Sequence, residues 1–302
     1  MLPSLRRCFK LSIGLLGKGT GLALCVASSA LAGLAPPEEP VPLNVVATDE
    51  SAVFASGFNH REIGRGSAFH STFDFTRRIP LVGNWFLQAG VSEERFDFGG
   101  PDRGPLPGTL QAVNLPLGVS YIIQGHIGFL AQLRPGFYFE HEISRGAFDV
   151  PLEIGGYWPL IDEKLYAAWG LRATVMQHYI AFPTAGLIWI IDSEPTLILH
   201  GILPEPRIEY TVNDKLAVWA GGELIGGTYK MDSGEGSKFS GTVVQYFEIR
   251  AGAGVTLTPV KGWSIKLAGG YACERKLDFY RADQSYIADP APYVRLQVSA
   301  EF

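Results

Sequence analysis

The last ten residues of the chain, YVRLQVSAEF, alternate strictly between apolar and polar side chains. Val294, Leu296, Val298, Ala300 and Phe302 are apolar, and the residues between them are polar. A period of two places the apolar side chains on one face of a β-strand. The same alternation recurs along most of the chain after residue 50, and no long stretch shows helical periodicity.

This alternation and the positions of the turn residues predict an all-β protein of twelve antiparallel strands. Most run for about 12–16 residues, longer than the strands of a typical soluble sheet. We expect them at 51–58, 67–79, 84–98, 109–123, 127–140, 147–160, 165–180, 197–212, 216–230, 243–258, 263–277 and 293–302. The difficult segment is 182–210, because DSEP at 192–195 could be a further turn and Pro204 and Pro206 cannot donate to a strand ladder. Ten or fourteen strands therefore remain open.

The predicted connections alternate along the chain between short and long. The short ones fall at 80–83, 124–126, 161–164, 213–215 and 259–262, and the longer polar or Gly/Pro-rich ones at 99–108, 141–146, 231–241 and 278–292. Nothing in the fold of a soluble β-sandwich requires all tight turns to lie at one end. In an outer-membrane barrel they do lie at one end, because the periplasmic turns are short and the outer loops are long.

Large aromatic residues cluster near the short turns. They occupy the apolar face of their strands, within about four residues of a short turn or of the chain end: Trp85, Tyr121, Phe129, Trp158, Tyr210, Trp263 and Phe302. Aromatic rings are favoured at a membrane–water interface, and transmembrane barrels carry such girdles. The sequence thus predicts a transmembrane antiparallel up-and-down β-barrel over residues 50–302, with the last strand closing against the first.

The N-terminus has the order of a secretory signal peptide. Basic residues precede an apolar stretch at 19–27, which is followed by ALAG at 30–33. We expect cleavage after Ala32, which makes 1–32 the signal peptide and 33–49 a flexible periplasmic tail. The pair Arg6–Arg7 also fits twin-arginine export. The general secretory route is favoured, because a membrane barrel cannot fold before export.

Composition and charge exclude several classes of protein. The chain is 47% hydrophobic and 18% charged, which is too apolar for a disordered chain. Outside the N-terminus, the longest apolar run, 185–191, is far short of the ~20 residues of a spanning helix. Loss of the signal peptide removes four basic residues and no acidic one, so the net charge falls from −5 to −9 and nucleic acid is not an expected partner. Only Cys273 remains, so no intramolecular disulfide is possible.

If the apolar faces meet lipid, the polar faces line the lumen. The candidate lumen-lining residues are Arg134, Glu153, Arg172, Glu205, Arg207, Glu209, Glu248, Arg250, Lys266 and Arg295. These charges either pair and fill the interior or line a hydrated pore and set its selectivity. A hydrolase is a third hypothesis, but His70 and Ser71 point to opposite faces of a strand. The histidines show no metal-ligand spacing, and no catalytic, metal or cofactor site is expected.

The C-terminal pattern of Val294, Leu296, Val298, Ala300 and Phe302 resembles the assembly signal of Gram-negative outer-membrane barrels. The tract LPEPRIEYTVNDKLAVWAGGELIGGTYK, residues 203–230, resembles uncharacterised outer-membrane barrel families in which a P-x-P-x-I-x-Y strand precedes a Gly-Gly…Gly-Gly-x-Tyr strand. The resemblance implies location in the outer membrane, with membrane lipid and the barrel-assembly machinery as partners. We expect a monomeric passive pore or transport protein for an unknown small solute. The alternative is a structural or surface-binding barrel with a filled lumen.

Overall fold

The computed structural model describes residues 41–60, 64–100, 106–123, 126–177, 180–193, 196–233 and 239–302. The predicted signal peptide and residues 33–40 of the predicted tail lie outside this range. The first strand, β1, begins at Asn44 rather than at Ser51, so it takes in the end of the segment expected to be a tail. Within the described ranges, no helix is both long enough and apolar enough to cross a membrane.

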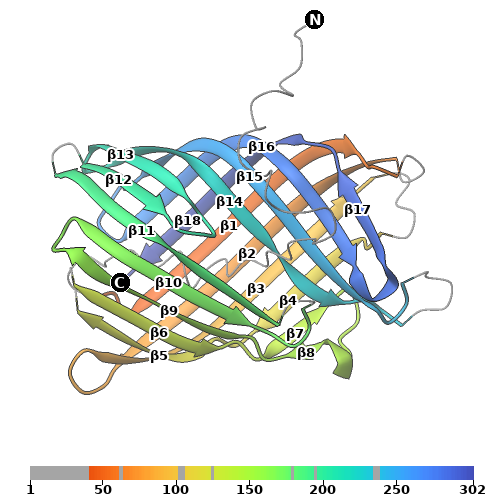
Figure 1. Ribbon diagram of the computed structural model, residues 1–302, viewed down its shortest axis with the longest axis horizontal. Coiled ribbons are helices and arrows are strands. Elements are labelled where there is room, and N and C mark those ends of the chain that lie inside the picture. The colour runs from red at the N-terminus through yellow and green to blue at the C-terminus, as the bar shows by residue number, and fades with distance from the viewer. Residues whose placement is uncertain are drawn as a thin grey trace, which may run out of the picture.

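The described chain folds into a closed antiparallel barrel of fourteen strands (Figure 1). Four of these strands consist of two segments separated by a short break: β4 with β5, β6 with β7, β8 with β9, and β17 with β18. In chain order they are β1 (Asn44–Gly57), β2 (Arg65–Pro80), β3 (Trp85–Gly99), β4 (Thr109–Asn114) with β5 (Leu117–Ile123), β6 (Ile127–Leu133) with β7 (Gly136–Phe139), β8 (Phe148–Asp149) with β9 (Leu152–Ile161), β10 (Leu165–Ala173), β11 (Ala181–Ser193), β12 (Thr196–Gly201), β13 (Arg207–Asn213), β14 (Leu216–Lys230), β15 (Val243–Leu257), β16 (Trp263–Phe279), and β17 (Gln284–Ala288) with β18 (Ala291–Glu301).

The sequence-based prediction is correct for most strands and wrong for one region. The segment 197–212, expected to be a single strand, forms the two short strands β12 and β13. Strand β11 precedes them. The twelve-strand prediction did not include it, but the further turn left open at 192–195 allowed it. Continuous apolar residues in β11 hide its period of two, and Pro204 and Pro206 end the ladder between β12 and β13. These two extra strands account for the difference between twelve and fourteen.

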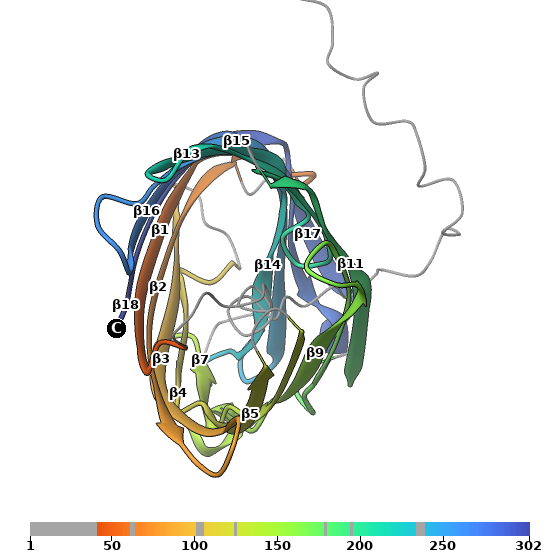
Figure 2. The same cartoon turned by 90° about the vertical axis from the view of Figure 1, so that its left-hand side faces the viewer.

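The barrel closes between its first and last strands, as the sequence predicted. Strand β1 pairs with β18 in antiparallel register from Val45 opposite Glu301 to Val53 opposite Tyr293. Backbone hydrogen bonds between Asn44 and Phe302 extend this seam to the end of the chain, with N–O distances of 2.7 and 3.0 Å. Figure 2 looks along the barrel from this end and shows the strands surrounding a central lumen. We call this end, which also carries the short turns, the inner end.

Prolines interrupt the two-segment strands. The breaks contain Pro116, Pro135, Pro151 and Pro290, none of which has an N–H to donate. The carbonyl groups of the first three still accept backbone hydrogen bonds from a neighbouring strand, each 2.9 Å long: Gly90 donates to Pro116, Leu115 to Pro135 and Arg134 to Pro151. The strands are therefore interrupted at these prolines without leaving the carbonyls of Pro116, Pro135 and Pro151 unpaired.

The short hairpin of β12 and β13 covers only the inner part of the wall. The carbonyls of Pro206 and Pro204 accept hydrogen bonds from Gly222 (2.8 Å) and Leu224 (3.0 Å), which extends the pairing along β14. At the outer end Lys230 of β14 pairs instead with Phe139 of β7, in parallel orientation. The strands around the lumen thus differ between the two ends of the barrel.

The outer surface of the barrel is apolar, and its predicted aromatic girdle is present. Exposed rings near the inner end belong to Trp85, Trp158, Tyr210, Trp263 and Phe302, and to Trp189 on the unexpected strand β11. Tyr121 packs on Trp85 with ring centroids 5.0 Å apart, and Phe129 lies 6.4 Å from Trp169. Such a surface is typical of a barrel that spans a membrane.

A charge placed in the middle of the apolar outer surface tests this assignment. Leu267 is 46% exposed on β16, midway between the outward rings of Trp263 and Tyr271. We expect Leu267→Lys to lower the free energy of unfolding in lipid vesicles by roughly 2–4 kcal/mol, because a lysine near the bilayer midplane is poorly solvated. Urea titration followed by tryptophan fluorescence measures the change. Val260→Lys, in the exposed turn before β16, is the matched control, and an equal loss at both positions would contradict the assignment.

Candidate functional site

The inner half of the lumen contains a polar cavity of about 240 Å³, here called the inner cavity. Its charged and polar lining comes from strands on opposite walls of the barrel. Of the predicted lumen-lining residues, the structure places Arg134, Arg172, Glu205, Arg207, Lys266 and Arg295 around it. The same cavity is lined by acidic residues that were not predicted: Asp49, Asp74, Glu93, Glu94, Glu223 and Glu301.

On one wall the charges gather around Arg134, at the break between β6 and β7. Side chains of four neighbouring strands surround its guanidinium: Ser92 at 2.8 Å, Asn114 at 3.0 Å, and Asp74 and Glu153 at 3.7 Å each. Glu153 is also 3.8 Å from Arg172 and accepts a 2.6 Å hydrogen bond from Gln132. A buried carboxylate is tolerated here because two guanidinium groups and an amide surround it.

On the opposite wall the charges gather around Arg295 of β18. Its guanidinium nitrogens lie 2.8 Å from Glu223, 2.8 and 3.0 Å from the two carboxylate oxygens of Asp49, and 3.6 Å from Glu205. Arg207 lies 3.1 Å from both Glu205 and Glu209. Both walls therefore carry paired charges of both signs, and the inner cavity lies between them.

Four predicted residues do not line this cavity. Glu209 pairs with Arg207 at 3.1 Å, whereas Glu248 and Arg250 on β15 are almost completely buried and pair with each other at 2.6 Å. Glu153 is likewise buried, behind Arg134 and Arg172, and not among the lining side chains. The alternation of apolar and polar residues identifies which side chains face the lumen. It does not show whether the lumen beside them is an open cavity or is filled by other side chains.

The unpredicted acids had different sequence signals. Asp74 and Glu94 lie on the inward parity of strands whose outward residues were already assigned, so alternation could have found them. Asp49 was assigned to the tail, and Glu223 lies between two glycine pairs in β14. Both are part of the Arg295 cluster, which only the closure of β18 on β1 and the course of β14 bring together.

The outer half of the lumen is filled by a core of buried apolar and aromatic side chains, here called the lumen core. It includes Phe96, Leu110, Tyr229, Phe239, Val244 and Phe279, all with no exposed surface. Phe239 stacks on Phe279 with centroids 3.9 Å apart and planes 15° apart. Tyr138 and Ile225 belong to this core and also line the inner cavity, so the two are in direct contact.

His70 joins the inner cavity to the lumen core. Its ring stacks on Phe96 at 4.1 Å, and its Nε2 lies 3.1 Å from the carboxylate of Glu94. Glu94 also accepts a hydrogen bond of 3.0 Å from the hydroxyl of Tyr229. His70 thus lies between the carboxylate of Glu94 and the ring of Phe96, and none of these contacts involves Ser71.

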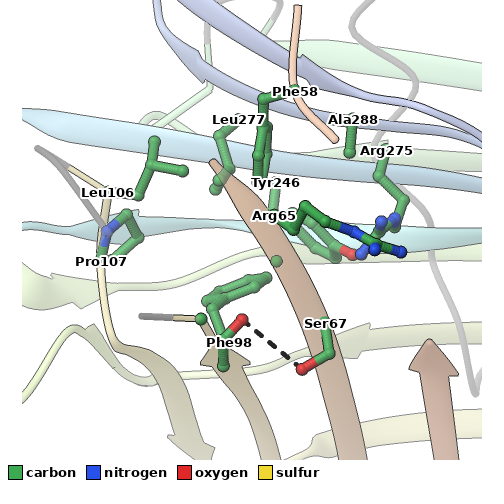
Figure 3. Close-up of a pocket in the computed structure, with 13 residues that line it drawn as sticks. Phe58, Arg65, Ser67, Phe98, Leu106, Pro107, Tyr246, Arg275, Leu277 and Ala288 are labelled. Atoms are coloured by element: carbon green, nitrogen blue, oxygen red, sulfur yellow. Dashed lines mark hydrogen bonds between the residues drawn. The ribbon is translucent and has the colours of Figure 1, made fainter. Parts of the chain in front are cut away.

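A second, apolar pocket lies on the other side of the lumen core, towards the outer end, and is here called the outer pocket (Figure 3). Its enclosed volume is about 30 Å³. The apolar lining consists mainly of Phe58, Phe98, Leu106, Pro107, Tyr246 and Leu277, and Arg65 and Arg275 complete it. Tyr246 and Leu277 are also members of the lumen core. The core therefore separates an apolar outer pocket from a charged inner cavity.

A cluster of potential metal ligands lies between two outer loops. Oxygen or nitrogen atoms of Glu140, His141 and Asp232 lie within 4.8 Å of one another, although the histidine spacing in the sequence gave no sign of it. The carboxylates already accept backbone hydrogen bonds: Asp232 from Glu142 at 3.0 Å, and Glu140 from Asp232 at 3.1 Å. These bonds join the loop after β7 to the loop after β14.

Comparison with known proteins gives no match to a family model and none to a curated protein sequence. Among solved structures, the chain is similar to an outer membrane channel from Pseudomonas putida F1, with a TM-score of 0.47 and 10% identity over 88% of this chain and 98% of that one. It is also similar to the Pseudomonas putida toluene transporter TodX, with a TM-score of 0.43 and 9% identity over 92% of this chain and 94% of that one. For the KdgM porin the TM-score is 0.36, with 9% identity over 85% of this chain and 99% of that one.

At these identities and TM-scores the solved structures carry no argument about this chain, and its class follows from its own features. The closed antiparallel sheet, the apolar outer surface with its aromatic girdle and the charged lumen are the features of outer-membrane-type transmembrane β-barrels, and the fold is of this class.

The buried pair of Glu248 and Arg250 allows a test of the charges in the lumen. These side chains are 0% and 2% exposed. We expect Arg250→Met to lower the free energy of unfolding by about 3–5 kcal/mol, because it leaves a carboxylate buried without its cation. Urea unfolding in vesicles measures the loss, and adding Glu248→Gln should recover much of it.

The matched control is the exposed pair of Arg95 and Asp97, whose contact distance is 2.8 Å. Arg95→Met should cost less than about 1 kcal/mol, because water solvates both partners of an exposed pair. If Arg250→Met is as mild as this control, Glu248 is not held as a buried carboxylate.

Proposed function

We propose that the protein is an outer-membrane channel for small solutes whose path is closed by the lumen core. The observation that carries the proposal is the position of that core, which separates the outer pocket from the inner cavity and contributes lining residues to both. A solute would enter the outer pocket, pass the core when its side chains move apart, and reach the inner cavity. The core thus acts as the gate of the channel.

The size and charge of the inner cavity fit this role. Its volume of about 240 Å³ is below the roughly 300–1,000 Å³ of pockets for drug-sized ligands, which favours small solutes. Its cations and anions are close to one another on each wall, so the cavity presents charged groups of both signs. Such a lining suits polar or charged solutes and does not exclude either sign of charge.

The alternative is a structural or surface-binding barrel in which the lumen core never opens. The specific observation in its favour is that the side chains of the lumen core are buried and that Arg134, Arg207 and Arg295 of the inner cavity have acidic partners. In that case the core and the ion pairs serve only to stabilise the barrel.

Conductance measurements separate the two functions. In planar lipid bilayers we expect rare and small openings from the wild-type barrel, because the lumen core closes the path. The double variant Phe239→Ala/Phe279→Ala removes the stacked pair of rings, and we expect larger and more frequent openings. The matched control is Phe69→Ala/Phe73→Ala, two exposed rings on the outer surface, which should conduct like the wild type. We call Phe239→Ala/Phe279→Ala the gate variant. If the folded gate variant conducts no more than the wild type, the result supports the filled barrel. Heat-dependent migration on gels checks that the variant is folded.

The proposed location in the outer membrane includes recognition by the barrel-assembly machinery through the last strand. The side chain of Phe302 is 67% exposed, whereas its backbone is bonded to Asn44, so replacing the ring leaves the seam intact. We expect Phe302→Ala to lower the amount of folded barrel in the outer membrane without changing export. Fractionation and quantitative blotting measure both quantities. Phe302→Tyr should behave like the wild type, and full assembly of Phe302→Ala would argue against the ring as a recognition element.

A further inference from the structure

Two arginine side chains share the outer pocket. Arg275 lies on β16 and is only 4% exposed, and Arg65 is the first residue of β2. In Figure 3 both guanidinium groups extend towards the same side of the pocket, next to the ring of Tyr246. Two cationic groups at one small apolar pocket repel each other unless an anion lies between them.

Neither arginine has a carboxylate partner in the described part of the chain. Arg65 donates to the backbone oxygen of Ala55 at 2.9 Å, and Arg275 donates from Nη2 to the hydroxyl of Ser56. The Nε of Arg275 is buried and has no hydrogen-bond partner among the described residues. A buried N–H of a charged group without a partner is costly, so this position favours an acceptor from outside the chain.

The acid nearest in register is already engaged. Glu248 stands opposite Arg275 in the pairing of β15 with β16. Its carboxylate oxygens are occupied by Arg250 at 2.6 Å and by the hydroxyl of Tyr246. Glu248 therefore does not supply the counter-ion within contact distance of Arg275.

Apart from Ser67, which donates to the backbone of Gly99, the remaining side chains that line the outer pocket are apolar. Phe58, Phe98, Leu106 and Leu277 present rings and methyl groups around the two guanidinium groups. The enclosed space of about 30 Å³ has room for a head group, while the rest of a ligand can lie along the apolar residues at the mouth. This combination selects an anionic head with a small apolar body, because guanidinium groups bind carboxylates through paired hydrogen bonds.

We propose that the outer pocket binds small amphipathic carboxylates, whose aromatic or short aliphatic body packs on Phe58, Phe98 and Leu277 while the carboxylate accepts hydrogen bonds from Arg65 and Arg275. The binding site stands on its own geometry. Only its role as the entry site for a transported solute rests on the proposed channel function. An inorganic phosphate or a phosphate of the lipid head groups shares the anionic chemistry but has no apolar body to fill the mouth.

Binding is measured by isothermal titration calorimetry on the purified full-length barrel in detergent, with benzoate and hexanoate as probes. Acetate, benzyl alcohol and inorganic phosphate are the comparisons. We expect benzoate and hexanoate to bind at least about ten-fold more tightly than acetate or benzyl alcohol, because only they combine a charge-assisted hydrogen bond with apolar contact. If benzyl alcohol binds as tightly as benzoate, the proposed recognition of a carboxylate is wrong. If inorganic phosphate binds as tightly as benzoate, the pocket is a site for phosphate groups and the proposal is overturned.

Substitutions then test the two arginines. Arg275→Gln and Arg65→Gln should each weaken benzoate about ten-fold or more, since each removes one charged donor. Arg65 is exposed at the start of its strand, so Arg65→Gln tests the site even where Arg275→Gln disturbs folding. The matched control is Arg95→Gln, an exposed arginine of β3 outside the pocket, which should leave the affinity unchanged. Unchanged affinity in folded Arg65→Gln and Arg275→Gln protein would overturn the site.

The outcomes keep this inference apart from the channel proposal. Binding of benzoate to a barrel that never conducts, even as Phe239→Ala/Phe279→Ala, supports the site and overturns the channel. Conduction by that gate variant without measurable benzoate binding supports the channel and overturns the site. Uptake of benzoate into vesicles that contain the gate variant, reduced by Arg65→Gln, would support both.

Discussion

The pairing of β1 with β18 is the constraint on which the rest of the structure depends. Within a bilayer no water is present to bond an exposed strand edge, so every backbone N–H and C=O of the wall must find its partner inside the sheet. The seam from Val45 to Val53 provides that partner for both end strands, and the bonds between Asn44 and Phe302 continue it. The same requirement explains the prolines, since Pro116, Pro135 and Pro151 occur where their carbonyls still accept from the next strand.

Closure of the wall also determines what the interior contains. Alternation sends every second side chain inwards, and the charged ones gather towards the inner end, where a cavity separates their two walls. Towards the outer end the inward residues are aromatic or aliphatic, and they fill the lumen. The order of the inward-facing residues along each strand therefore determines the division of the lumen into a charged inner cavity and an apolar outer part. On β3, for example, Glu94 lies at the boundary and Phe96 inside the lumen core.

The sequence is informative about the wall and much less so about the interior. A period of two with regularly spaced turns yields the strand ranges, the outward face and the aromatic girdle, because each depends only on residues close together in the chain. The stack of Phe239 on Phe279 and the bond from Tyr229 to Glu94 join residues far apart in the chain, and no local pattern indicates them. The twelve-strand prediction left out β11 for a different reason, since its continuous apolar run lacks the alternation that marks a wall strand. Only the further turn left open at 192–195 allowed for it. Asp49 was missed because the start of β1 was placed too late.

The inner cavity and the outer pocket both contain arginines, but they differ in whether those arginines have acidic partners. In the inner cavity Arg134 and Arg295 each have acidic side chains within 3.7 Å, so an entering carboxylate would replace one acid by another at little change in charge. In the outer pocket Arg65 and Arg275 have no such partner among the described residues, so a carboxylate there would neutralise charge that these residues leave uncompensated. An anionic solute would therefore be held more firmly at the outer pocket than in the inner cavity. In the proposed channel, such a solute would be captured from dilute solution at the outer pocket and released from the inner cavity, with the lumen core between them as the barrier.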